Sequence, residues 1–155
     1  MAQNFAENVV AKLEELGIKR IYGLVGDSLN PLSDAVRQSD IEWVHVRNEE
    51  AAAFAAGADS LAADELAVCG ASCGPGNTHF VQGLYESHRN GSKVLAIASH
   101  IPTMEIGSSF FQETHPELLF QECSSYCEVV HNPDQGMRVF HNAVQNLSLI
   151  HISEP

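Results

Sequence analysis

Two adjacent acids, Glu49 and Glu50, follow an apolar run and open an alanine-rich stretch. Asn48 is a good helix N-cap, and acids in the first turn are stabilised by the positive end of the helix dipole. Capping is therefore the ordinary interpretation of the pair. A carboxylate at a strand-to-helix junction, among small side chains, is also well placed for proton transfer. Both hypotheses stay open on this pattern alone.

A second candidate is Gly74-Pro75-Gly76-Asn77, which lies between a predicted strand and a predicted helix. Its glycines favour a tight turn, but a helix start can also bind a phosphate, and glycine lets a planar ring approach the backbone. The spacing matches neither G-x-G-x-x-G nor a Walker loop. His79, just beyond, is more often an exposed polar residue than a catalyst. The aromatics of Phe110-Phe111-Gln112-Glu113 are typical of a lid or interface.

Four cysteines form two C-x-x-x-C pairs, Cys69 with Cys73 and Cys123 with Cys127. This spacing permits a zinc hypothesis, but zinc knuckles usually use C-x-x-C. Cys69 also falls in a predicted buried strand. Buried free thiols in a reducing compartment are the favoured interpretation, and no metal ligand is assigned.

Helix-type spacing and apolar runs alternate in the elements that must position these residues. Phe5, Val9, Leu13 and Leu16 recur at helical spacing, and Gly17 is a natural C-cap. The pattern predicts helices over residues 4–16, 30–38, 76–87 and from 49 onward, and strands over residues 18–25, 41–46, 66–70 and 94–98.

Alternation of helices with near-continuous apolar strands predicts an α/β fold, with a parallel β-sheet flanked by helices on both faces. In such sheets ligands bind at the carboxyl ends of the strands. The loops expected along that edge are residues 26–28, 47–50, 70–77 and 99–112.

The pattern loosens after His100. Residues 101–111 are expected to form a long loop, and residues 124–130 a short strand. Asn132-Pro133-Asp134 predicts the start of a last helix, with Met137, Phe140, Val144 and Leu147 on its inner side. The tail, residues 148–155, is a poor strand and is of doubtful origin.

The chain has a net charge of -12 and only eight Lys and Arg residues among 155. This balance argues against a nucleic-acid partner, which needs clustered basic residues. No apolar run approaches the roughly 20 residues of a membrane span, and no signal-peptide pattern opens the chain. A cytoplasmic location is expected.

Five separated blocks together resemble one family. They are residues 21–30 (Ile-Tyr-Gly-Leu-Val-Gly-Asp-Ser-Leu-Asn), 47–58 (Arg-Asn-Glu-Glu-Ala-Ala-Ala-Phe-Ala-Ala-Gly-Ala), 74–77 (Gly-Pro-Gly-Asn), 83–97, and 111–116 (Phe-Gln-Glu-Thr-His-Pro). Over about residues 3–147 the chain resembles the N-terminal, pyrimidine-binding domain of thiamine-diphosphate enzymes of the pyruvate oxidase type, and especially the quinone-dependent pyruvate dehydrogenases.

The resemblance implies roles for particular residues. Glu49 matches the catalytic glutamate that bonds the pyrimidine ring of the cofactor and promotes loss of the thiazolium C2 proton, whereas Glu50 is structural. Gly74, Pro75, Gly76, Asn77 and His79 match the cofactor-binding turn and its neighbours. Gly26, Asp27 and Ser28 match a substrate-side loop. Phe111 and Gln112 match residues that face the reacting ring.

The resemblance also implies cofactors and partners. Thiamine diphosphate would be bound here, while Mg²⁺ and FAD would be bound by a C-terminal and a middle domain that residues 1–147 do not include. The expected reaction is decarboxylation of pyruvate to acetate, with a quinone acceptor, in a homo-oligomer (a dimer-based tetramer). Membrane-peripheral contact is expected only of the full-length protein, and the chain alone is expected to be inactive.

Two alternatives stay open: another enzyme of this fold, such as an acetolactate synthase or a phosphate-dependent pyruvate oxidase, or an inactive dimerisation module. Two departures from the family pattern are Asn48, where many relatives have histidine, and Gly91-Ser92-Lys93, which replaces a more usual Val-Pro turn.

Overall fold

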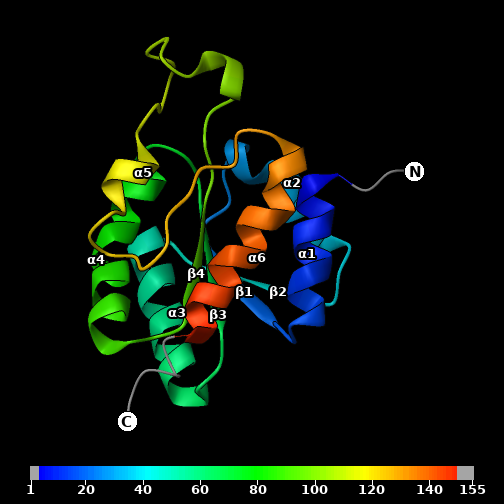
Figure 1. The fold of residues 1–155 in the computed structure, drawn as a ribbon, viewed down its shortest axis with the longest axis vertical. Coiled ribbons are helices and arrows are strands. Elements are labelled where there is room, and N and C mark those ends of the chain that lie inside the picture. Colours follow the sequence, from blue (N-terminus) through cyan, green and yellow to red (C-terminus); the bar gives the residue numbers. More distant parts are fainter. Residues whose placement is uncertain (1–3, 150–155) are drawn as a thin grey trace.

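Four strands form one parallel sheet in the order β2-β1-β3-β4 (Figure 1). The computed structural model describes residues 4–149. Tyr22 pairs with Val44 on one side and with Cys69 on the other, and Cys69 in turn pairs with Ala96. The predicted parallel α/β fold is confirmed. The strands are β1 (Arg20–Gly23), β2 (Glu42–His45), β3 (Ala67–Ala71) and β4 (Val94–Ala98).

Each predicted helix is present. Asn4 starts the first one with a capping box: its Oδ1 accepts from the Glu7 N–H at 2.9 Å, and the Glu7 carboxylate accepts from the Asn4 N–H at 2.8 Å. The helices are α1 (Phe5–Glu15), α2 (Asn30–Arg37), α3 (Glu49–Ala63), α4 (Pro75–Asn90), α5 (Pro116–Leu119) and α6 (Pro133–Leu149), with 3₁₀ turns η1 (Asp27–Leu29) and η2 (Thr103–Glu105).

Helices cover both faces of the sheet. In Figure 1, α1, α2 and α6 lie on one side, and α3 and α4 on the other. The first face buries large aliphatic side chains such as Leu13 and Ile21. The second is built from alanines around Phe80. Small residues let α3 and α4 approach closely, because a Cβ on Gly83 would lie 2.5 Å from the Cβ of Ala53.

The predicted strand over residues 124–130 is wrong, because this segment pairs with no strand of the described chain. Local side-chain bonds take the place of a ladder. Ser124 donates to the Phe120 carbonyl at 2.7 Å, and Gln135 donates to the Val129 carbonyl at 3.2 Å. The helix that follows packs its predicted inner residues, including Met137 and Phe140, against the first core.

The tail predicted from Ser148 begins inside the last turn of α6, which ends at Leu149. Residues 150–155 lie outside the described residues. Among residues 4–149, no helix combines the length and the apolar character needed to cross a membrane.

The single tryptophan, Trp43 of β2, packs over neighbouring strands. A Cβ on Gly70 would lie 3.1 Å from its ring, and one on Gly23 would overlap it. Glycine near the carboxyl ends of β1 and β3 thus gives the indole a flat surface. Its Nε1 is buried without a hydrogen-bond partner in the described part of the chain.

Candidate functional site

The loops after the strands meet at the carboxyl edge of the sheet, as the sequence predicts. Ser28, after β1, has its Oγ 2.9 Å from the Oγ of Ser72 and 2.6 Å from the Oγ of Ser99. Ser72 follows β3 and Ser99 follows β4. Sequence reasoning missed Ser72 and Ser99; their place directly after a strand is the signal that could have found them.

Glu49 and Glu50, at the start of α3, differ in burial and in their partners. Asn48 caps the helix, and its Oδ1 accepts from the Glu50 N–H at 2.7 Å. Glu50 remains half-buried, whereas Glu49 is only 6% exposed. One Glu49 oxygen, Oε2, lies 3.1 Å from Nδ1 of His79, whose side chain is 51% exposed. The other, Oε1, faces Gly76, where a Cβ would lie 3.1 Å away.

Gly74 is packed directly against Gln112. Its φ of +68° suits glycine, and a Cβ would lie 2.6 Å from the Cβ and 2.9 Å from the carbonyl oxygen of Gln112. Gln112 itself has a φ of +64°, which is uncommon for a residue with a side chain. Its Oε1 accepts a weak hydrogen bond from the Cys73 thiol at 3.6 Å. The long loop is thereby joined to the glycine turn.

Asn77, predicted to lie beside the cofactor, is completely buried. Its Nδ2 donates to the Ser99 carbonyl at 2.9 Å, and its Oδ1 has no hydrogen-bond partner among the described residues. The side chain therefore joins α4 to the end of β4 rather than lining an open surface.

Other predicted residues stay at the surface. Asp27 and Pro75 are exposed, and Phe111 is 78% exposed. No hydrogen bond or ion pair joins these three residues to the Glu49 carboxylate in the described part of the chain. Gly26 lies inward, because a Cβ there would come 2.5 Å from the Ser72 hydroxyl.

The cysteines are free thiols; Cys69, Cys73 and Cys123 are buried, and Cys127 is partly buried. Burial raises the pKa of the Cys69 thiol. Among residues 4–149, no group of three or more His, Cys, Asp or Glu side chains is arranged to hold a metal ion.

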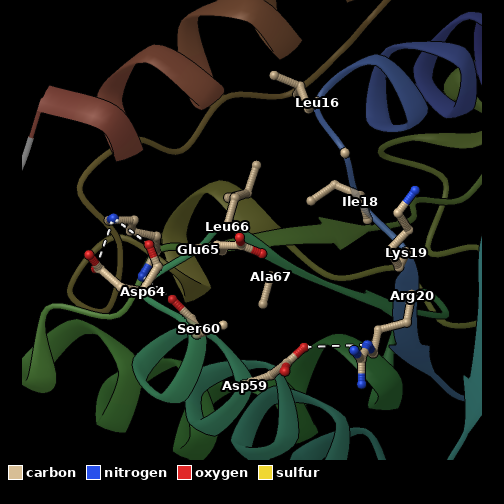
Figure 2. Close-up of a pocket in the computed structure, with 13 residues that line it drawn as sticks. Leu16, Ile18, Lys19, Arg20, Asp59, Ser60, Asp64, Glu65, Leu66 and Ala67 are labelled. Atoms are coloured by element: carbon tan, nitrogen blue, oxygen red, sulfur yellow. Dashed lines mark hydrogen bonds and ion pairs between the residues drawn. The ribbon is translucent and has the colours of Figure 1, made fainter.

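A cavity of about 470 Å³ lies at the opposite, amino edge of the sheet (Figure 2). Two of the cations that line it, Lys93 and Arg20, have structural partners. Lys93 donates to the carbonyl at 3.0 Å and the carboxylate at 3.1 Å of Asp64, the C-cap of α3. The guanidinium of Arg20 lies 3.7 Å from the carboxylate of Asp59. Ion pairs and a helix cap account for these charges.

Comparison with known proteins places this fold in a family. Residues 3–120 match the family described as thiamine pyrophosphate enzyme, N-terminal TPP binding domain. An uncharacterised 42.6 kDa protein in the isoamylase 3′ region of Pseudomonas amyloderamosa is 56% identical, over 90% of this chain and 36% of that protein.

Two relatives carry enzyme names. Pyruvate oxidase of Lactiplantibacillus plantarum is 33% identical over 76% of this chain and 20% of its own length. Acetolactate synthase isozyme 2 large subunit of Escherichia coli is 29% identical over 90% of this chain and 26% of its own length. The chain thus spans only 20% to 36% of the length of the three relatives named here. It belongs to the thiamine pyrophosphate enzyme family and contains the N-terminal thiamine pyrophosphate binding domain.

Proposed function

We propose that this chain forms the pyrimidine-binding half of a thiamine diphosphate site in an enzyme that decarboxylates pyruvate oxidatively to acetate. The observation that carries the proposal is the Glu49 carboxylate, buried beside a glycine turn at the ligand edge of a parallel sheet. Relatives named pyruvate oxidase and acetolactate synthase support a pyruvate-type substrate.

The turn fits a flat, polar ring. A Cβ at Gly76 would fill the space in front of Glu49 Oε1, so glycine keeps that oxygen approachable from the backbone side. His79 contacts the other oxygen, Oε2. Glu49 would therefore share a proton with the ring at Oε1 while His79 fixes the carboxylate plane. When bound, thiamine diphosphate supplies the centre that holds the electrons released on decarboxylation.

The remaining assignments complete this proposal. Gly74 and Gly76 admit the ring, and Pro75 and Asn77 hold the turn. The loop of residues 26–28, with Phe111 and Gln112, would border the substrate. Residues 1–147 would be one domain of a longer cytoplasmic homo-oligomer whose other domains bind Mg²⁺, the diphosphate and FAD, and pass electrons to a quinone.

A second candidate is acetolactate synthesis, favoured by the Escherichia coli relative that aligns with 90% of this chain. Product analysis of the longer protein with pyruvate distinguishes the two, because one reaction yields acetate and the other acetolactate. Acetyl phosphate would indicate a phosphate-dependent oxidase. A monomeric chain without affinity for thiamine diphosphate would contradict both the cofactor site and a dimerisation module.

The direct test is Glu49→Gln in the full-length protein. Loss of the proton-sharing oxygen should lower the rate of pyruvate decarboxylation by about 100-fold or more. Glu50→Gln is the matched control, since Glu50 is half-buried and offers its backbone N–H to Asn48. An unchanged decarboxylation rate in Glu49→Gln would show that the catalytic assignment is wrong.

A further inference from the structure

The three serine hydroxyls at the carboxyl edge form a series of hydrogen bonds. Counting the proton and the lone pairs of each hydroxyl shows which one donates in each bond. A hydroxyl has one proton and two lone pairs. Ser99 donates its proton to the Ala71 carbonyl at 2.9 Å. Ser28, 2.6 Å from the Ser99 hydroxyl, must therefore donate to it. The Ser72 hydroxyl, 2.9 Å from Ser28, must then donate to Ser28.

This direction saturates Ser28. Its Oγ also accepts from the backbone N–H of Cys73 at 2.9 Å, so its one proton and both lone pairs are used. No capacity is left for a substrate group. The series of hydrogen-bonded hydroxyls ends at a backbone carbonyl, which accepts a hydrogen bond but cannot pass a proton on. Its role is therefore to hold the loops, not to conduct protons.

The segment that Ser28 holds carries the proposed site. Cys73 directly precedes Gly74, which packs against Gln112, and Gly76 faces Glu49 two residues further on. We propose that Ser28 is a positioning residue, which fixes the glycine turn through the Cys73 N–H and does not hydrogen-bond substrate. What it positions rests on the proposed function; the hydrogen bond itself does not.

The test uses this chain, isotopically labelled, and follows the Cys73 amide by NMR. Ser28→Ala should accelerate its hydrogen exchange about fivefold, as expected for loss of one hydrogen bond, and shift its proton resonance upfield. Ser28→Thr keeps the hydroxyl and should restore both values. Ser72→Ala should change exchange less than twofold, because the Ser28 oxygen stays. Ser33→Ala, in the adjacent α2, is the control: its exposed hydroxyl bonds only the Asn30 carbonyl.

Unchanged exchange at Cys73 in Ser28→Ala, or no restoration by Ser28→Thr, would overturn the proposal. If Ser28→Ala does not fold, Ser28→Cys gives the same reading, because sulfur is a weak acceptor. Addition of thiamine diphosphate separates the two levels. Failure of the unsubstituted full-length protein to bind thiamine diphosphate would count against the proposed function, whereas the Cys73 result would still decide the role of Ser28.

Discussion

The two edges of the parallel sheet handle charge in different ways. At the amino edge, the cation of Lys93 lies against the carboxylate of Asp64, the C-cap of α3, and that of Arg20 lies against Asp59 within α3 (Figure 2). At the carboxyl edge, Glu49 is almost fully buried, and among described residues its carboxylate forms an ion pair only with the half-exposed ring of His79. One edge pairs its charges near solvent, and the other keeps one carboxylate away from it.

The difference shows that a hollow is weaker evidence for a site than an unusual charge. The amino-edge cavity has a volume of about 470 Å³, yet the cations Lys93 and Arg20 in its wall are explained by ion pairs and a cap. Burial of a polar side chain with few hydrogen-bond partners costs free energy. Local features that cost stability are expected at functional sites, and Glu49 is such a feature.

The largest effect on stability should come from Gly74→Ala. A methyl group would meet the Gln112 backbone and adopt an unfavourable φ, which should lower the free energy of unfolding by about 3 kcal/mol. Gly91→Ala is the comparison at the other end of α4: it has the same φ of +68°, but its ψ is 24° instead of -118°, and it has no neighbouring atom within 4 Å of a Cβ. It should cost only about 1 kcal/mol. Urea unfolding followed by circular dichroism measures the free energy of unfolding of both variants. Equal losses in the two would contradict the predicted difference between these positions.

A smaller effect is expected at the amino edge from Lys93→Met. The Asp64 carboxylate is 79% exposed, so the ion pair and cap together should contribute no more than about 1 kcal/mol, and less at high salt. Lys12→Met removes an exposed pair with Glu15 and serves as the comparison. A loss above about 2 kcal/mol for Lys93→Met would mean that this edge is more than a structural closure.

The smallest effect should be local and dependent on pH. The Glu113 carboxylate accepts backbone hydrogen bonds, first from Gly107 and then from Phe110, and these lower its pKa. A lowered folded-state pKa stabilises the loop above the ordinary value of about 4.3, and this contribution is lost as pH falls through the folded pKa. Amide shifts of Gly107 and Phe110 should therefore change below about pH 4.

Two controls accompany that titration. Glu113→Gln should remove the pH dependence, and the Lys93 N–H, which bonds Ser60 at 2.8 Å on the amino edge, should not follow it. If the amide shifts at both edges changed with pH in the same way, the Glu113 carboxylate would not be their cause.

The sheet and its helices are predictable because a local sequence pattern specifies each strand and each helix. The strand expected over residues 94–98 coincides with β4, since a continuous apolar run between turn residues defines it. Residues 124–130 were predicted incorrectly for the opposite reason. Their composition permits an extended chain, but a strand also needs a neighbour to pair with, which no local pattern specifies.

The candidate site also has features that are predictable from the sequence and features that are not. Glu49 and the glycine turn can be predicted from motifs, and the structure brings them together. The inward side chain of Asn77 and the saturation of Ser28 could not be predicted. They depend on contacts between loops; Ser28 and Ser99 are 71 residues apart in sequence. Such contacts are set by how the strand ends converge, not by any one segment.

The position of Trp43 has a practical consequence. Because the chain has a single tryptophan, and its ring rests on glycines near the carboxyl ends of β1 and β3, its fluorescence is a built-in optical reporter of that edge. A ligand or substitution that shifts these strand ends should change emission without any added label. The amino edge has no comparable fluorophore, so the signal would be specific to the side of the molecule that carries Glu49.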